Sequence, residues 1–260
     1  TFPTTANAIV RNNLKPVFVD CDIGTYNANL DEIRKAIGPK TRAVFLPHTL
    51  GNVSDMDQIM DICQKNNLYL IEDTCDALGS TFKGKMAGTF GIMGTFSFYP
   101  AHHMTMGEGG AVCTDDPIVK KTILSLRDWG RDCWCKTGVS DTCHKRFGWK
   151  LGDLPEGYDH KYIYSTLGYN LKPLDIQAAI GLKQLDKLPH FEQKRKENFK
   201  KIYDHLQQFE EHLFLPEKVD GADPSWFCFP ISVRENQSFT RKDLTHFLEN
   251  RKIETRMLFA

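Results

Sequence analysis

Short apolar runs alternate with stretches of helical spacing through the first half of the chain. The runs have the length of buried β-strands and lie at residues 16–20, 42–46, 68–71 and 91–96. Between them, residues 30–37 and 56–63 repeat apolar positions every three or four residues, which predicts helices. Strands that alternate with helices are typical of a mainly parallel sheet with helices on both faces. The pattern therefore predicts an α/β fold.

The pattern changes after residue 128. Residues 128–168 are rich in Gly, Asp and aromatic residues, and so long an irregular stretch in a compact domain usually serves a function. We predict a large domain over residues 1–190, with an insertion at 128–168, and part of a small α+β domain over 191–260. The expected later elements are helices at 172–188, 191–209 and 240–250 and strands at 226–233 and 253–259.

Composition and charge narrow the function classes. The 260 residues include 33 Lys and Arg and 33 Asp and Glu, so the net charge is zero. This balance indicates no basic face and argues against nucleic acid or an anionic membrane as a partner. No apolar run is long enough to span a bilayer and no signal peptide is present, so we predict a cytoplasmic protein. Eight cysteines in a chain of this length do not form a small disulfide scaffold, and clustered ones indicate metal or redox chemistry.

Candidate chemistry gathers where two predicted strands end. Asp73 follows one strand and Ser97 ends the next, and ligands of such sheets bind at the carboxyl ends of strands. His102 comes five residues after Ser97, before the Gly-rich turn 107–110, so the segment suits an anion and a base. Taken alone, His102 would be a solvated loop residue and Asp73 a carboxylate that caps a turn.

The segment SFYPAHHMTMGEGG resembles the motif SFxxxKxxTxGEGG of the DegT/DnrJ/EryC1/StrS family, sugar aminotransferases that use pyridoxal phosphate (PLP). The resemblance implies the PLP-dependent transferase fold type I, with a seven-stranded type of sheet. It also implies that Ser97 contacts the cofactor phosphate. Asp73, in EDTCDA, matches the family's EDxAQA, whose Asp pairs with the pyridine nitrogen. Asn170, in GYNLKPLDIQAA, would reach the phosphate of a neighbouring subunit's cofactor, which implies a homodimer.

One departure from the motif changes the implied chemistry, because His102 stands where the family has Lys. Imidazole cannot form the Schiff base that holds an aldehyde cofactor, but it can act as a base near neutral pH. The resemblance then implies pyridoxamine phosphate (PMP) held without a covalent bond, with His102 as the catalytic base. Asp76 replaces the family's usual Gln, and its role stays open. We expect His103 to be a solvated loop residue and assign no role to His48.

Four cysteines, Cys75, Cys133, Cys135 and Cys143, have the spacing C-x57-C-x-C-x7-C. Together with the missing Lys, this spacing resembles the CDP-6-deoxy-4-hexulose 3-dehydrases within the family. That resemblance implies a [2Fe-2S] cluster held by the four thiolates. A structural zinc site and four buried structural cysteines remain alternatives. We expect the other four to pack within elements: Cys21, Cys63, Cys113 and Cys228.

The same resemblance implies a reaction and a partner. The substrate would be CDP-4-keto-6-deoxyglucose, deoxygenated at C3 for 3,6-dideoxyhexoses, with electrons from an NADH-dependent flavin and iron–sulfur reductase. A cluster-free PMP dehydrase and a non-catalytic subunit that has lost the Lys remain open. The first residues, TFPTTANA, resemble an internal segment of the family, so we expect the sequence to be a window from a longer protein.

Overall fold

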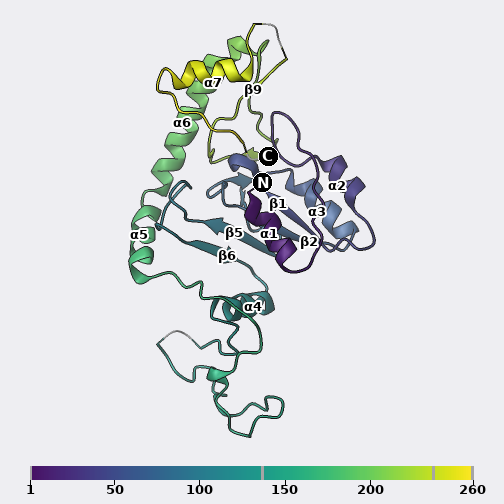
Figure 1. Ribbon diagram of the computed structural model, residues 1–260, viewed down its shortest axis with the longest axis vertical. Coiled ribbons are helices and arrows are strands. Elements are labelled where there is room, and N and C mark those ends of the chain that lie inside the picture. The colour runs from purple at the N-terminus through teal and green to yellow at the C-terminus, as the bar shows by residue number, and fades with distance from the viewer. Residues whose placement is uncertain (1, 136–137, 236–237, 259–260) are drawn as a thin grey trace. The chain divides into compact units, whose positions relative to one another are not determined.

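The structure, a computed structural model, describes residues 2–135, 138–235 and 238–258 (Figure 1). The chain forms two compact units, one of residues 1–113 with 179–260 and one of residues 114–178. The domain boundary expected at residue 190 falls inside the first unit, and the division into a large and a small domain stays a prediction.

The main sheet of the first unit has the strand order β1-β2-β5-β6 (Figure 1). Its strands are β1 (Ala43–Pro47), β2 (Tyr69–Asp73), β5 (Met93–Ser97) and β6 (Gly110–Cys113). β1, β2 and β5 are parallel, and β6 returns antiparallel to β5. No helix crosses over between β5 and β6, and a connection without a crossover favours the antiparallel return. The parallel core is confirmed, and the sheet as a whole is mixed.

Three helices belong to the N-terminal part of this unit: α1 (Pro3–Arg11), α2 (Leu30–Ala36) and α3 (Met56–Lys65). The side chains of Asn29 and Asp55 cap α2 and α3 by accepting hydrogen bonds from backbone N–H groups in their first turns. α3 turns Met56, Ile59 and Ile62 into the core, where they join residues of β1 and β2. The ends of α2 and α3 lie within two residues of the bounds predicted from the sequence.

The C-terminal half carries α5 (Asp175–Leu185), α6 (Leu188–Leu206) and α7 (Arg241–Glu249), close to the three predicted helices. A reciprocal pair of bonds between Thr240 and Asp243 caps α7. Short strands form a three-stranded sheet and a two-stranded ribbon. They are β3 (Thr81–Phe82), β4 (Lys85–Met86), β8 (Ala222–Asp223), β7 (Leu213–Phe214) and β9 (Ser232–Val233).

Three predicted strands are wrong. Residues 16–20 form no strand, and Val17 and Phe18 are 64% and 72% exposed. Of residues 226–233 only the last two, in β9, are in a strand. Residues 253–258 form none, while residue 259 lies outside the described residues. A segment rich in residues that favour strands forms one only where a neighbouring strand supplies hydrogen bonds and packing.

The second unit contains α4 (Pro117–Arg127), which the hydrophobic pattern did not reveal, and a long irregular segment. The segment is closed at its base, where the Trp129 N–H donates to the Tyr169 carbonyl at 2.8 Å and the Asp132 N–H donates to the Ile163 carbonyl at 2.9 Å. Deeper in the segment, the buried ring of His160 stacks on Trp149. The predicted irregular stretch is confirmed, and backbone hydrogen bonds and ring stacking hold it in place.

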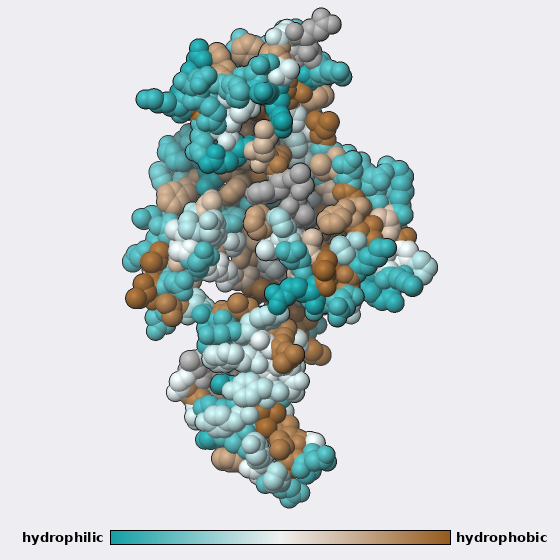
Figure 2. Space-filling model, viewed as in Figure 1, coloured by the Kyte–Doolittle hydropathy of each residue, from teal (hydrophilic) through white to brown (hydrophobic). Residues whose placement is uncertain are grey.

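Figure 2 shows hydrophobic side chains in small groups between hydrophilic ones on the drawn face. No helix within the described ranges is long and apolar enough to cross a bilayer.

Candidate active site

Asp73 is the last residue of β2, at the carboxyl end of the parallel strands. Its Oδ2 accepts a hydrogen bond from the Thr5 hydroxyl at 2.7 Å, and its Oδ1 accepts one from the Cys75 N–H at 3.2 Å. Thr5 is buried, so α1 fixes the carboxylate from one side. A half-buried carboxylate held in this way suits pairing with a protonated ring nitrogen.

Ser97 ends β5, the strand beside β2. Asp73 lies opposite Thr95 in the register, so Ser97 follows two residues later at the same edge of the sheet. Its Oγ accepts a hydrogen bond from the Tyr99 N–H at 3.3 Å, and Ser97 pairs with Gly110 of the Gly-rich turn. The structure thus brings Asp73 and Ser97 to one edge, as parallel strands require.

His102 lies in the turn that follows Ser97, and its backbone N–H donates to the Tyr99 carbonyl at 3.0 Å. Its side chain is only 17% exposed, and Nδ1 lies 3.4 Å from Oδ1 of Asp76. The ring packs against Phe227, with 5.4 Å between centroids. Among the described residues Nδ1 has no hydrogen-bond partner of good geometry. The predicted base is therefore a partly enclosed imidazole beside a carboxylate.

His103 corrects the prediction of a solvated loop residue. Its side chain points into the interior, where the residue is 2% exposed and Nε2 donates to the Ser225 carbonyl at 2.6 Å. Burial lowers the pKa of His103 to about 4, so the ring is neutral. His103 fastens the motif turn to a segment far along the chain.

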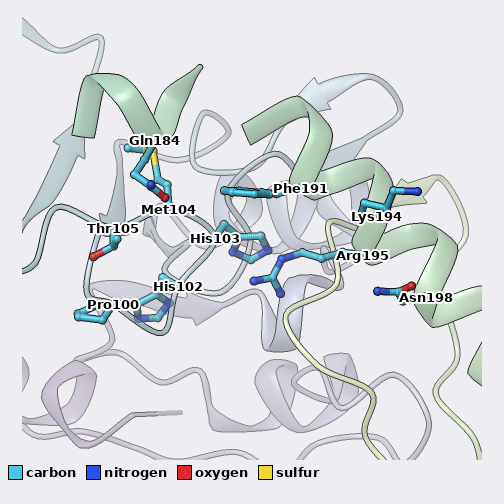
Figure 3. A pocket seen from close by; sticks show the side chains of 10 residues that line it. All are labelled: Pro100, His102, His103, Met104, Thr105, Gln184, Phe191, Lys194, Arg195 and Asn198. Atoms are coloured by element: carbon cyan, nitrogen blue, oxygen red, sulfur yellow. The ribbon is translucent and has the colours of Figure 1, made fainter. Parts of the chain in front are cut away.

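A cavity of about 350 Å³ lies between the motif turn and helices α5 and α6 (Figure 3). In Figure 3 the Arg195 guanidinium points toward His103, whereas the Lys194 amine points away from it. Arg195 Nη1 donates to the carbonyls of Trp226 and Phe227 at 3.1 and 3.0 Å. Lys194 pairs with Glu197 at 2.6 Å. The cavity is thus bounded by His102 and His103 on one side and an anchored Arg on the other.

A buried hydrogen-bonded pair behind the strand end, Glu72 with His48, was missed from the sequence. Glu72 is fully buried, and its carboxylate accepts hydrogen bonds from His48 Nε2 and from the N–H groups of Gly88, Phe90 and Gly91. Burial alone would raise the pKa of Glu72, but the bonds from His48 and Gly91 outweigh it and the pKa lies below its usual value. The only sequence signal was a Glu at an apolar position beside Asp73. The pair ties β1, β2 and the segment before β5 together beneath the site.

Three of the four predicted cluster ligands lie in the second unit. Cys133, Cys135 and Cys143 are half-buried, and the Cys135 thiol interacts with the other two. A hydrogen bond with the Thr142 side chain lowers the pKa of Cys135 to about 7. Cys143 Sγ also lies 3.3 Å from Nε2 of His160. These three thiols interact on the irregular segment, and their role as metal ligands stays a prediction.

The fourth predicted ligand, Cys75, belongs to the first unit. Burial and the charge of Asp73 raise the pKa of its thiol. Within residues 2–135, 138–235 and 238–258, no three His, Cys, Asp or Glu side chains are arranged to hold a metal ion. The four-thiolate metal site therefore stays a prediction.

The predictions for the remaining residues, Asn170 and the other four cysteines, have different outcomes. Asn170 is exposed and forms a bridge to Asp128 within the second unit, and its role across a subunit boundary stays a prediction. Cys63 is buried in the core, as expected. The packing prediction is wrong for Cys21, Cys113 and Cys228, which are exposed.

Comparison with known proteins finds relatives that match the whole chain. A protein of Salmonella typhimurium, the lipopolysaccharide biosynthesis protein RfbH, is 54% identical over 100% of this chain and 59% of its own length. The dTDP-4-dehydro-2,6-dideoxy-D-glucose 3-dehydratase of Saccharopolyspora spinosa is 52% identical over 100% of this chain and 56% of its own length. The chain thus spans less than two thirds of these relatives.

Solved structures show the same fold. The Escherichia coli GDP-4-keto-6-deoxy-D-mannose-3-dehydratase with bound hydrated PLP superimposes with a TM-score of 0.80 at 32% identity, over 98% of this chain and 62% of that one. The fold is that of the PLP-dependent aminotransferases, a mixed sheet with flanking helices. The profile of the DegT/DnrJ/EryC1/StrS aminotransferase family matches residues 1–260. This chain therefore belongs to the DegT/DnrJ/EryC1/StrS aminotransferase family.

Proposed function

We propose that the protein containing this chain is a PMP-dependent sugar-nucleotide 3-dehydratase. The observation that carries the proposal is the imidazole of His102, on the turn after Ser97, at the position where the motif has Lys. Relatives that are 52% and 33% identical are named as 3-dehydratases of a dTDP-sugar and a GDP-sugar, which supports dehydration at C3. Because the nucleotides of those two substrates differ, the nucleotide that this protein recognises needs a separate test.

The residues at the sheet edge fit PMP. When bound, PMP supplies an amine that condenses with the sugar's 4-ketone and a ring that accepts electrons. Asp73, fixed by Thr5 and Cys75, keeps the ring nitrogen protonated. The Ser97 hydroxyl and the Gly-rich turn bind the phosphate. Asn170 of the second subunit in a homodimer would add a contact to the same phosphate.

His102 is the catalytic base. With the cofactor bound, its imidazole would take up the proton at the 4′ carbon, a task for which a neutral imidazole is suited. The C3–O bond of the sugar would then break, and the hydroxyl would take the proton held by His102 and leave as water. An amine could have formed a Schiff base with the aldehyde cofactor, whereas an imidazole cannot, so His102 favours dehydration over transamination.

The finer proposal concerns the substrate and the reductant. We expect CDP-4-keto-6-deoxy-D-glucose as the substrate, in 3,6-dideoxyhexose biosynthesis for lipopolysaccharide, within the cytoplasm. Replacing the C3 hydroxyl by hydrogen consumes two electrons and two protons and releases water. NADH would supply the electrons through a flavin and iron–sulfur reductase. Cys75, Cys133, Cys135 and Cys143 would hold a [2Fe-2S] cluster, and the three interacting thiols of the second unit support this.

The test uses the full-length protein, purified without oxygen and supplied with PMP. We expect about two irons per chain and a visible absorption band, both lost in Cys133→Ser and retained in Cys113→Ser, whose thiol is exposed outside the proposed set. Mass spectrometry should show the 3-dehydrated product from one of the CDP-, dTDP- and GDP-linked 4-keto sugars. Dehydration without iron would leave a cluster-free dehydratase, and zinc would make the thiols a structural site. No dehydration of any of the three sugars would reject the function.

A further inference from the structure

We propose that Asp76 is a positioning residue that sets the tautomer of His102, with the proton on Nδ1 and Nε2 free to act as the base. The proposal rests on the proposed function, in which His102 is the base. Nothing in the motif resemblance assigns a role to this carboxylate, because the family's usual residue there is Gln.

The carboxylate lies where the imidazole needs an acceptor. Asp76 Oδ1 is 3.4 Å from His102 Nδ1, and the two side chains are 28% and 17% exposed. Nδ1 itself is buried, and no described residue offers it a well-aligned hydrogen bond. A buried N–H without an acceptor costs about 1–3 kcal/mol, so Nδ1–H is favoured only if it points at this carboxylate. Catalytic hydrogen bonds are often long without the ligand and tighten when it binds.

The ring has little freedom to turn away. Phe227 lies against it at a centroid distance of 5.4 Å, and the Tyr99 ring lies 6.4 Å away at an angle of 74° to it. Phe227 is held in turn, because its carbonyl accepts a hydrogen bond from Arg195. The neighbouring His103 fastens the turn to Ser225. The ring is therefore held by two aromatic neighbours and through its backbone, and Nδ1 lies on the side of Asp76.

The chemical consequence follows from the two ring nitrogens. In a neutral imidazole one nitrogen donates and the other accepts a hydrogen bond. If Nδ1–H donates to Asp76, Nε2 keeps its lone pair and can take a proton from the cofactor. The carboxylate also stabilises the imidazolium that this transfer creates, as in other base–carboxylate pairs. The amide of Gln could orient the ring but could not offer that charge.

The first test is spectroscopic and needs neither cofactor nor turnover. Long-range ¹H–¹⁵N spectra of the full-length protein report the tautomer of each of the nine histidines in this chain, and the spectrum of His102→Gln identifies the signals of His102. We expect the Nδ1–H tautomer in the unmodified protein and in Asp76→Glu. Asp76→Asn should populate both tautomers. An Nε2–H tautomer in the unmodified protein would overturn the proposal without any variant, and so would an unchanged tautomer in Asp76→Asn.

The second test measures turnover of the PMP-loaded protein with the 4-keto sugar nucleotide. Asp76→Asn should lower kcat about 100-fold and leave KM nearly unchanged, because Asp76 acts on the base and not on substrate binding. Asp76→Glu should recover part of the rate. Asp61→Asn is the matched control, because it removes a carboxylate that pairs with Lys65 on the exposed surface. It should leave both the rate and the tautomer unchanged.

The two proposals fail in different ways. If the unmodified protein shows the Nδ1–H tautomer and Asp76→Asn shifts it, but no sugar is dehydrated, the positioning role stands and the proposed function falls. If the sugar is dehydrated equally fast by Asp76→Asn, and its tautomer is unchanged, the function stands and the positioning role is overturned.

Discussion

Replacing Glu72 by Gln should be one of the most destabilising near-isosteric changes in this chain. The Glu72 carboxylate is fully buried and accepts four hydrogen bonds. One oxygen serves the N–H groups of Phe90 and Gly91, each at 2.7 Å. The other serves His48 at 2.9 Å and Gly88 at 2.7 Å. Gln has nearly the same shape, so the change tests the hydrogen bonds and the charge rather than the packing.

The magnitude follows from counting orphaned donors. Gln has one oxygen and one amide group, and in either orientation the amide faces two buried N–H donors. Each buried donor without an acceptor costs about 1–3 kcal/mol. The loss of an expensive buried charge offsets part of this. We expect the free energy of unfolding to fall by about 3 kcal/mol.

The assay is urea unfolding of the full-length protein followed by circular dichroism, with hydrogen exchange at the β2 amides as a local probe. Glu32→Gln removes an exposed carboxylate that pairs with Lys35 and should leave the midpoint nearly unchanged. The effect should also depend on pH. Because the folded pKa of Glu72 lies below its unfolded value, its stabilisation is present above the unfolded pKa and is lost as the pH falls through the folded pKa. A loss below about 1 kcal/mol at neutral pH would refute the reasoning.

Three further changes test the scaffold of the site. Neutral His103 contributes stability that is present above its unfolded pKa of about 6.5 and is lost as the pH falls toward its folded pKa of about 4. The free energy of unfolding should therefore fall on the order of 3 kcal/mol between pH 7 and pH 4, and His103→Gln should reduce this decline. Gly51→Ala should cost about 3 kcal/mol in chemical unfolding, because Gly51 has φ +92° and its Cβ would lie 2.4 Å from the Ser225 carbonyl oxygen; a change near zero would contradict the close approach. Met56→Ala should also cost about 3 kcal/mol, since Met56 is fully enclosed in the core, and an unchanged melting curve would contradict that packing.

The sequence was sufficient for features that depend on local patterns. The periodicity of residues 30–37 and 56–63 predicted α2 and α3, and the strand ends placed Asp73 and Ser97 at one edge. Residues 16–20 show the limit of this reasoning. Their composition favours a strand, but no described strand pairs with them, and pairing is a property of distant parts of the chain.

The interior of the site depended on contacts that the sequence does not show. His103 donates to a carbonyl 122 residues away, so its burial could not be inferred from the neighbouring polar residues. The partners of Glu72 are His48, 24 residues earlier, and a segment 16–19 residues later. The sequence shows Asp76 only as a departure from a motif, whereas the fold of the turn brings it close to His102.

The central claim is that His102 makes this protein a dehydratase rather than a transaminase. The most direct measurement incubates the full-length protein, PMP and the CDP-linked 4-keto sugar in H₂¹⁸O without any reductase, and follows the C3 carbon by ¹³C NMR. Loss of the C3 hydroxyl and its return from solvent should place ¹⁸O on C3, and His102→Asn should abolish this exchange. Conversion of the 4-ketone to a 4-amine with no ¹⁸O on C3 would contradict the claim.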